Sequence, residues 1–247
     1  MAEVIGGVNP VLEALRSGAA RIQRIYLAEN RSGRVAGEIL ELARSGNLSV
    51  QRVDRERLDR MYGGGGHQGV VAEVGPYQYH DFEEILLRGA GDRSLVLILD
   101  GIQDPGNLGS LLRSAEAAGA AGVVIPRERA APVTAAAVKA SAGAAEHLPV
   151  ARVVNLSRAL DEMKERGFWI VGADAEAGTC LYDVKLPARM GLVVGAEGRG
   201  LRRLVKEKCD LLVSIPLKGR VASLNASAAG ALFLFEFVRR GEKPGPD

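Results

Sequence analysis

Apolar residues recur along this chain in two alternating forms, short continuous runs and longer stretches with helical spacing. After Ser94, continuous runs such as 95–99, 122–125 and 191–194 alternate with amphipathic stretches that end near glycine. Continuous apolar runs are typical of parallel strands that are buried on both faces, and helices must cover those faces. The pattern therefore predicts an α/β fold with a parallel sheet over residues 93–241.

The first part of the chain has a smaller pattern of the same kind. A run at 22–27 predicts a strand, and Asn9-Pro10 predicts a helix that begins at Asn9 with proline in its first turn. Glycine and proline then become frequent over 75–92. The chain is therefore predicted to hold a small α/β domain (1–74), a linker (75–92) and the larger domain (93–241).

The last predicted helix, from about Ser223 to Arg239, is apolar nearly all round. Such a helix needs cover on both faces, which one domain rarely supplies at its chain end. We expect this C-terminal helix to form much of a homodimer interface. The alternative is a single core helix buried within its own domain.

Composition narrows the class of protein only slightly. The 247 residues are 47% hydrophobic and 25% charged, which allows a sizeable core. No apolar run approaches the ~18 residues of a membrane span, and the N-terminus lacks a signal-peptide pattern, so we expect a cytoplasmic protein with no membrane partner. Cys180 and Cys209 have no paired spacing and suit free thiols. The three histidines are scattered, so we expect no metal site.

The charge balance is close to neutral, with a formal net charge of +2. This value alone does not indicate a nucleic-acid binder. The basic residues are mostly arginine, however, and no lysine occurs before Lys139. Arginine suits phosphate contacts and base stacking. Codon bias in a GC-rich genome would give the same composition.

Three sequence blocks carry candidate chemistry, and each follows a predicted strand. The first runs from Leu99 to Ala115, where a Pro-Gly turn leads to Asn107 at a helix start and Arg113 lies six residues further on. Ligands of parallel sheets bind at the carboxyl ends of the strands. A plain helix cap for Asn107 and a surface role for Arg113 are the alternatives.

The second block, 193–203, passes from a strand into a glycine-rich loop that contains Gly195, Gly198 and Glu197. Glycines there allow backbone to approach a ligand closely. The spacing does not match the dinucleotide pattern Gly-x-Gly-x-x-Gly, which argues against a dehydrogenase. Glu197 alternatively serves only the dipole of the following helix.

The third block, 215–227, contains Pro216 at a strand end, then a loop, then Ser223 and Asn225 at the start of the last helix. Two short polar side chains at one helix start exceed what a cap requires. The additional side chain is therefore free to face a ligand.

The order and spacing of these blocks resemble the SpoU (TrmH-like) class of the SPOUT RNA methyltransferases over roughly residues 95–240. The segments 7–15, 67–73 and 140–149 resemble one branch of that class, the bacterial 23S rRNA guanosine 2′-O-methyltransferases. That branch carries a small RNA substrate-binding domain ahead of the catalytic domain.

The resemblance implies a catalytic domain with a deep trefoil knot, an exception to the rule against knots, and a homodimer. It implies S-adenosyl-L-methionine (AdoMet) as methyl donor and RNA as partner, in particular 23S rRNA or a pre-ribosomal particle. Cofactor-binding roles carry over onto the glycine loop and the third block: Gly195, Gly198, Ile215, Leu217 and Leu224. Catalytic and positioning roles carry over onto all three blocks: Asn107, Arg113, Glu197, Ser223 and Asn225.

The implied reaction requires activation of a ribose 2′-hydroxyl, which is a weak nucleophile. The family's first-block arginine falls on Arg113, yet a guanidinium with a pKa above ~12 is a poor base in isolation. Two versions stay open. Either Arg113 accepts the proton in a special environment, or it stabilises the developing charge while a phosphate or Glu197 accepts the proton.

The N-terminal domain resembles a small ribosomal-protein-like RNA-binding fold. Four of its arginines are candidates for phosphate or base contacts, and a solvated charged surface is the alternative: Arg21, Arg24, Arg31 and Arg34. His67 and Gln68 either contact RNA or end a flexible loop. Two rival functions are a tRNA 2′-O-methyltransferase and a non-enzymatic RNA-binding protein on an inactive methyltransferase scaffold.

Overall fold

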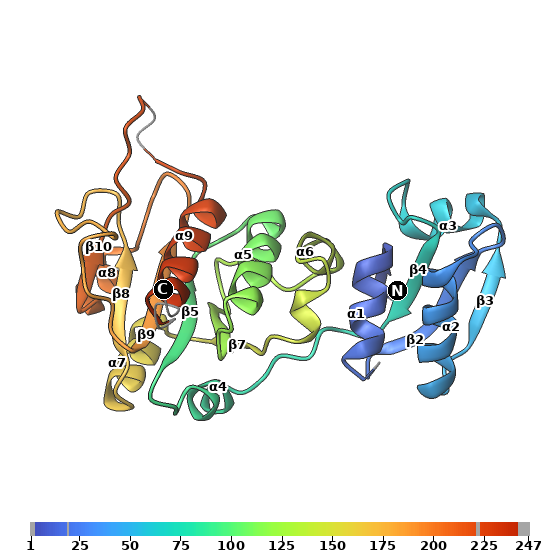
Figure 1. The fold of residues 1–247 in the computed structure, drawn as a ribbon, viewed down its shortest axis with the longest axis horizontal. Helices are drawn as coiled ribbons and strands as arrows, with labels where there is room; N and C mark the ends of the chain where they lie inside the picture. Colours follow the sequence, from blue (N-terminus) through green and yellow to red (C-terminus); the bar gives the residue numbers. More distant parts are fainter. Residues whose placement is uncertain (1–2, 19, 221–222, 242–247) are drawn as a thin grey trace, which may run out of the picture.

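The structure, a computed structural model, describes residues 3–18, 20–220 and 223–241. Two separate sheets, one of four strands and one of six, form the centres of an N-terminal and a C-terminal part (Figure 1). The N-terminal part is drawn in blue at one end of the molecule, and the C-terminal part fills the other end. The α/β fold predicted for both parts is confirmed.

The N-terminal sheet has the strand order β1-β4-β2-β3, in which only β2 and β3 are parallel. Two helices, α1 and α2, cover one face, and α3 covers the other. α1 begins two residues earlier than expected, with Gly7 rather than Asn9 as its N-cap. The elements are β1 (Glu3–Gly6), α1 (Val8–Arg16), β2 (Ile22–Ala28), α2 (Arg34–Ser45), β3 (Val50–Val53), α3 (Arg55–Tyr62) and β4 (Val70–Val74).

The C-terminal sheet has the order β10-β8-β9-β5-β6-β7, and every neighbouring pair is parallel. The strands are β5 (Ser94–Asp100), β6 (Gly122–Pro126), β7 (Val150–Val153), β8 (Trp169–Ala173), β9 (Arg189–Gly195) and β10 (Leu211–Val213). The helices are α4 (Phe82–Arg88), α5 (Pro105–Ala117), α6 (Ala135–Ala140), η1 (Ala144–Glu146), α7 (Leu156–Glu165), α8 (Arg203–Lys208) and α9 (Ala226–Gly241).

The central strand β5 explains the layered packing of this part. All seven of its residues are buried, and successive side chains point to opposite faces. Leu97 packs with α5, α6 and α9 on one face, while Ile98 packs with α4, α7 and α8 on the other. Burial on both faces is the reason that these strands are continuously apolar rather than alternating.

The segment 75–92, expected to be a linker, is only partly one. It contains α4, whose Ile85 and Leu86 are buried in the core beneath β6 and β7. The helix therefore belongs to the C-terminal domain, and the true connection is shorter than expected. The frequent glycine and proline residues of 75–92 indicated a linker, and the apolar face of α4, with only two buried residues, was too short to indicate a core helix.

Within the single chain, helix α9 is covered on only one face, which differs from the alternative of a core helix buried within its own domain. One face is buried against α5 and β9 through Phe233, Leu234 and Phe237. On the other face, Leu232 is 41% exposed and Phe235 is 48% exposed. The single chain thus leaves an apolar surface uncovered on its last helix. No helix in the described part of the chain is long and apolar enough to cross a membrane.

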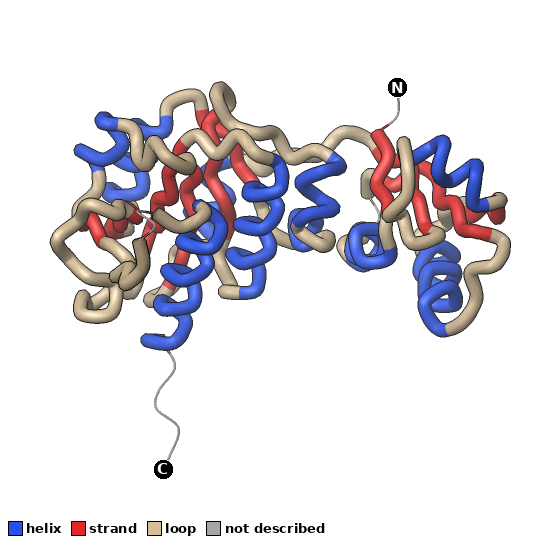
Figure 2. Tube along the Cα trace, turned by 90° about the horizontal axis from the view of Figure 1, so that it is seen from above, coloured by secondary structure: helices blue, strands red, loops and turns tan. Residues whose placement is uncertain are grey.

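The two domains are in direct contact through α1 and β1 on one side and α6 and η1 on the other (Figure 2). Arg21 donates to the carboxylate of Glu146 from Nη2 at 2.6 Å and from Nε, and both side chains are less than one-tenth exposed. The Tyr77 hydroxyl donates to the carbonyl oxygen of Ala145 at 3.0 Å, and its ring lies beside the Arg21 guanidinium. Burial raises the pKa of Tyr77, so its hydroxyl keeps its proton.

This buried ion pair should stabilise the docked arrangement. In Glu146→Gln the Arg21 guanidinium stays buried without a counter-charge, so we expect a loss of about 3 kcal/mol in the free energy of unfolding, measured by urea titration. The matched control is Glu83→Gln, because Glu83 pairs with Arg166 on the exposed surface and should contribute less than ~1 kcal/mol. Equal effects in the two variants would contradict a specific docking role for Glu146.

Candidate active site

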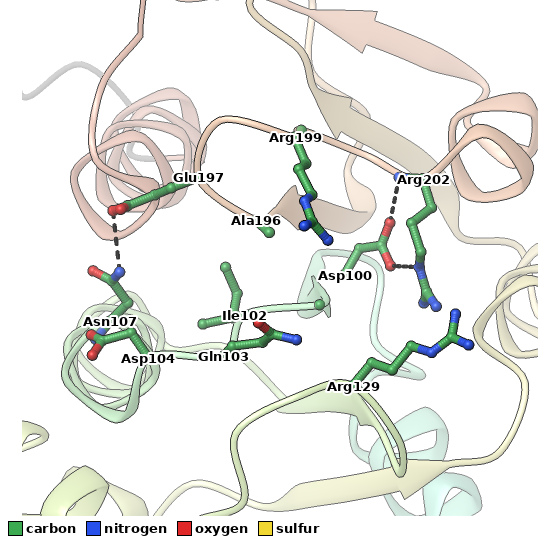
Figure 3. Close-up of a pocket in the computed structure, with 12 residues that line it drawn as sticks. Asp100, Ile102, Gln103, Asp104, Asn107, Arg129, Ala196, Glu197, Arg199 and Arg202 are labelled. Atoms are coloured by element: carbon green, nitrogen blue, oxygen red, sulfur yellow. Dashed lines mark hydrogen bonds and ion pairs between the residues drawn. The ribbon is translucent and has the colours of Figure 1, made fainter.

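The candidate site lies at the carboxyl ends of β5 and β9. These strands are parallel neighbours, and their last residues, Asp100 and Gly195, pair with each other. The loops that follow the two strands therefore leave the sheet side by side (Figure 3). In open parallel sheets this edge is where ligands bind.

Asn107 is free to serve the site because another residue caps its helix. The Oδ1 atom of Asp104 accepts a hydrogen bond from the backbone amide of Asn107 at 2.7 Å, and Pro105 is the first helical residue. The expectation that Asn107 opens α5 was therefore wrong. The Asp-Pro pair before it is a standard start signal that would have corrected the boundary.

A single carboxylate oxygen connects three separate segments of the chain. The Oε1 atom of Glu197 accepts from Asn107 Nδ2 at 3.1 Å, from Asn225 Nδ2, and from the backbone amide of Ala226 at 3.3 Å. Asn225 Nδ2 also donates to Asn107 Oδ1 at 2.8 Å. Hydrogen bonds to a charged acceptor are stronger than neutral ones, so this cluster holds the three segments in a fixed relation.

Asn225 has two roles at the start of α9. Its Oδ1 atom accepts from the backbone amides of Ser227 and Ala228, which caps the helix. This fixes the direction of the amide, so Nδ2 must point to Glu197. Ser223 lines an adjacent cavity.

Two cavities adjoin at the turn 196–200. One, of about 500 Å³, lies between the β9 loop, the segment after β10 and the start of α9, and all five expected cofactor residues line it: Gly195, Gly198, Ile215, Leu217 and Leu224. The other, of about 390 Å³, lies between the β5 and β9 loops and is lined by Asn107. Glu197 lines both cavities.

The turn between the cavities depends on its glycines. A Cβ atom on Gly195 would lie 2.3 Å from the carbonyl carbon of Gly200, so no other residue fits without moving the backbone. The amide of Gly200 donates to the carbonyl of Ala196, and Gly198 and Gly200 have positive φ values of 71° and 63°. Glycine adopts this backbone without the steric cost that other residues meet.

The larger cavity has polar residues that the sequence analysis missed. Asp174, directly after β8, lines it and pairs with Lys206. Burial opposes ionisation of Asp174, but the hydrogen bonds from Lys206 and from the amide of Glu176 outweigh it and lower its pKa. Asp174 could have been found from its place after a buried parallel strand, the same signal that located Glu197.

Arg113 is not brought to this cluster within the single chain. It follows Asn107 by six residues on α5, which places it about 120° around the helix axis. Its side chain is exposed, and it lines neither cavity. Among the described residues no carboxylate pairs with it. Four of the five expected catalytic residues therefore gather at the cavities, and Arg113 lies on the outer surface of α5.

The four N-terminal arginines do not form one cluster. Arg21 is engaged by Glu146 at the domain contact, so its expected RNA role requires breaking a buried ion pair. Arg24 and Arg34 are exposed, and Arg31 is half-buried. The guanidinium of Arg24 lies at 3.5 Å from the Tyr26 hydroxyl.

His67 and Gln68 have structural roles in the N-terminal domain. His67 is fully buried, and its Nδ1 atom accepts from the amide of Gly69, which leaves Nε2 to donate to Asp59. Gln68 accepts from the amide of Val8 at the start of α1. Within the described ranges, no group of three acidic, histidine or cysteine side chains is placed to hold a metal ion.

Comparison with known proteins identifies the family. The model of the SpoU rRNA methylase family matches residues 94–235, and a model described as RNA 2′-O ribose methyltransferase substrate binding matches residues 4–80. The chain belongs to the SpoU rRNA methylase family. It is accordingly an AdoMet-dependent RNA 2′-O-methyltransferase, and both the recognition and the cofactor expected from the sequence are confirmed.

Individual relatives match over nearly the whole chain. YacO of Bacillus subtilis (strain 168), assigned by name to the TrmH family of tRNA/rRNA methyltransferases, is 45% identical over 97% of this chain and 96% of its own. The 23S rRNA (guanosine-2′-O-)-methyltransferase RlmB of Salmonella typhimurium is 42% identical over 97% and 99%. The SpoU methyltransferase AviRb of Streptomyces viridochromogenes in complex with AdoMet is 27% identical, covering 96% and 89%, with a TM-score of 0.78.

The hydrogen-bond cluster predicts a separation between turnover and cofactor binding. Asn107 lines the smaller cavity but not the larger one, so Asn107→Ala should lower kcat by roughly 100-fold, as for removal of one positioned donor. Its Kd for AdoMet, measured by calorimetry, should change less than about twofold, since no contact there is lost.

The control is Glu116→Ala, an exposed change on the same helix. A large loss of AdoMet affinity in Asn107→Ala, with turnover kept, would place Asn107 in the cofactor site instead.

Proposed function

We propose that this enzyme methylates the 2′-hydroxyl of a guanosine in 23S rRNA, acting as a homodimer in the cytoplasm. The observation that carries the site assignment is the position of Glu197, which lines both cavities and binds Asn107 and Asn225. One cavity would then hold the methyl donor and the other the target ribose. RlmB, which matches both domains, supports the guanosine of 23S rRNA as substrate.

The larger cavity suits AdoMet in size and in chemistry. Its volume of about 500 Å³ lies within the range of small-molecule sites. Ile215, Leu217 and Leu224 offer apolar walls for a ring, and the glycine turn offers backbone groups. Asp174 offers a carboxylate for hydroxyl or amine donors. When bound, AdoMet supplies a methyl group attached to a sulfonium, and the neutral thioether that remains after transfer is a good leaving group.

The protein's own residues must position the 2′-hydroxyl and remove its proton. Asn107 and Asn225 hold Oε1 of Glu197, and no described residue donates to Oε2. That second oxygen is free to accept the hydroxyl proton as the oxygen–methyl bond forms. This assignment favours the version in which Glu197 accepts the proton and Arg113 stabilises the developing negative charge.

The trefoil knot is also part of the proposal. A knot requires the chain after β10 to pass through the loop that follows β9 or its neighbours. The close approach of Gly195 to Gly200, and the shared cavity formed by the β9 loop and residues 213–229, support such threading. Residues 221–222 of the segment lie outside the described part of the chain.

The proposed dimer uses the uncovered face of α9. An apolar groove there is lined by Tyr182, Leu224, Leu232 and Phe235, each between about one-third and one-half exposed. Exposed apolar patches of this kind mark protein interfaces. Since α5 packs beside α9, a partner seated on this groove would lie next to the outer surface of α5, which carries Arg113.

The substrate assignment is tested by methyl transfer from labelled AdoMet to unmodified 23S rRNA and to tRNA, side by side, with the modified ribose mapped. We expect one 2′-O-methylguanosine in 23S rRNA, because the N-terminal domain matches the substrate-binding model of these enzymes. Label in tRNA alone would overturn the rRNA assignment. Absence of label in both RNAs, with AdoMet still bound, would overturn free 23S rRNA as the substrate and point to a pre-ribosomal particle or another RNA.

The place of Arg113 is tested by mixing two inactive subunits. Arg113→Ala should abolish transfer and spare AdoMet affinity. If Arg113 serves the partner's site, Arg113→Ala mixed with Asn107→Ala at equal amounts regains about a quarter of wild-type activity, since half the dimers have one intact site. Arg158→Ala, an exposed change on the opposite side of the sheet, is the control.

No recovery in the mixed sample would place Arg113 in its own subunit's site. Sedimentation of the wild type as a monomer at micromolar concentration would refute the dimer itself.

A further inference from the structure

The smaller cavity has two chemically different ends. At one end lie Asn107 and Glu197, the hydrogen-bonded amide and carboxylate described above. At the other end, Arg129 extends into the cavity from the loop after β6, and Arg199 and Arg202 extend into it from the loop after β9 (Figure 3). Nothing in the family-derived assignment gives these arginines a role.

The arginine end carries more positive charge than its acidic partner neutralises. Asp100 is 1% exposed, and its two oxygens accept from the backbone amide of Arg202 at 2.7 Å and from Arg202 Nε at 2.5 Å. This pair is self-contained. Arg129 and Arg199 have no carboxylate within ion-pair distance among the described residues. Two guanidinium groups are therefore left in one cavity without a counter-charge.

Unusual backbone conformations occur at Arg129 itself and at the two neighbours of Arg199. Arg129 has a φ of 60°, which is rare for a residue with a side chain and costs of order 1 kcal/mol. The loop that contains Arg129 is joined to the β5 loop by the amide of Ala131, which donates to the carbonyl of Ile102. Arg199 lies between Gly198 and Gly200, which both have positive φ. Strained backbone such as that of Arg129 occurs mostly at functional sites.

The phosphates of an RNA substrate would supply the missing negative charge. A ribose within RNA has a phosphodiester on each side, and its 2′-hydroxyl is adjacent to the phosphate on the 3′ side. If the ribose lies at Asn107 and Glu197, that phosphate would lie further along the same cavity, toward the arginine end. Arginine forks bind phosphate oxygens in pairs and fix the register of a nucleic acid without reading its sequence.

We infer that Arg129 and Arg199 bind the phosphodiester on the 3′ side of the target ribose and thereby position its 2′-hydroxyl at Glu197. The inference rests on RNA being the substrate and is independent of which RNA is methylated. Arg129 and Arg199 are positioning residues here, and neither takes part in the transfer of the proton or the methyl group. Arg129 lines only the smaller cavity, so its role is separable from cofactor binding.

The test uses the full-length enzyme with Arg129→Asn and Arg199→Gln, since asparagine tolerates positive φ better than other residues with side chains. Each change should raise the Kd for RNA roughly 10-fold and reduce the slope of log K against log salt by about 0.7. The kcat at saturating RNA should also fall, but less than in Asn107→Ala, because neither arginine contacts the reacting hydroxyl. The matched control is Arg127→Gln, an exposed arginine on the same loop outside both cavities.

A neutral methylphosphonate at the 3′ phosphate of the mapped ribose then identifies the contact. Wild-type enzyme should bind this RNA about as weakly as Arg129→Asn binds the natural RNA. Arg129→Asn itself should bind the methylphosphonate RNA only slightly more weakly than it binds the natural RNA, because the contact is already lost. Additive losses, or an unchanged salt slope in both variants, would overturn the inference. Weakened AdoMet binding in Arg129→Asn with RNA affinity kept would also overturn it. If the wild-type enzyme methylates tRNA rather than rRNA, the same test applies to the mapped ribose of that tRNA.

Discussion

The carboxylate of Glu197 is the point on which the arrangement of the site depends. Its Oε1 atom accepts from Asn107 on α5, from Asn225 before α9 and from the first amide of α9. These residues are 90 and 28 positions away from it in the sequence. Without that charge, nothing else in the described structure ties the glycine turn to both helix starts at once. Glu197 belongs to the turn that both cavities share, so the cluster also fixes where the two cavities meet.

The parallel pairing of β5 with β9 makes this convergence possible. Asp100 and Gly195 end the two strands at the same level, so each following loop faces the other rather than solvent alone. Asp100 then fixes the far end of the smaller cavity through Arg202, as Glu197 fixes its near end. Two carboxylates at neighbouring strand ends thus give one cavity an amide-lined end and a cationic end.

Much of the C-terminal fold follows from the sequence pattern. Strands buried on both faces, such as β5 and β9, leave an unmistakable apolar run, and three short blocks indicate where they end. The ends of the helices were predicted less accurately than the strands. Asp104 and Asn107 are both suitable N-cap residues, and only the structure shows that Asp104 caps α5. The packing of α4 in the core was not predicted, because its only buried residues are Ile85 and Leu86, and two apolar residues are too few to show a helical repeat.

Interactions between residues far apart in the chain were beyond the sequence pattern. Nothing near Arg21 indicates that its partner is Glu146, which lies 125 positions away in the other domain. The positive φ of Arg129, whose loop is joined to the β5 loop by the amide of Ala131, likewise had no signal in its own segment. Charge and composition locate candidates, and only tertiary contacts decide which of them face a ligand and which are already paired.

The central claim is that two adjoining cavities, joined at Glu197, bring a methyl donor and a ribose together. A crystal structure of the enzyme with AdoMet tests it most directly. The account predicts that AdoMet occupies the cavity lined by Gly195, Ile215 and Leu224, with its methyl group directed at the Asn107–Glu197–Asn225 cluster. AdoMet bound outside that cavity, or with its methyl group turned away from Glu197, would contradict it.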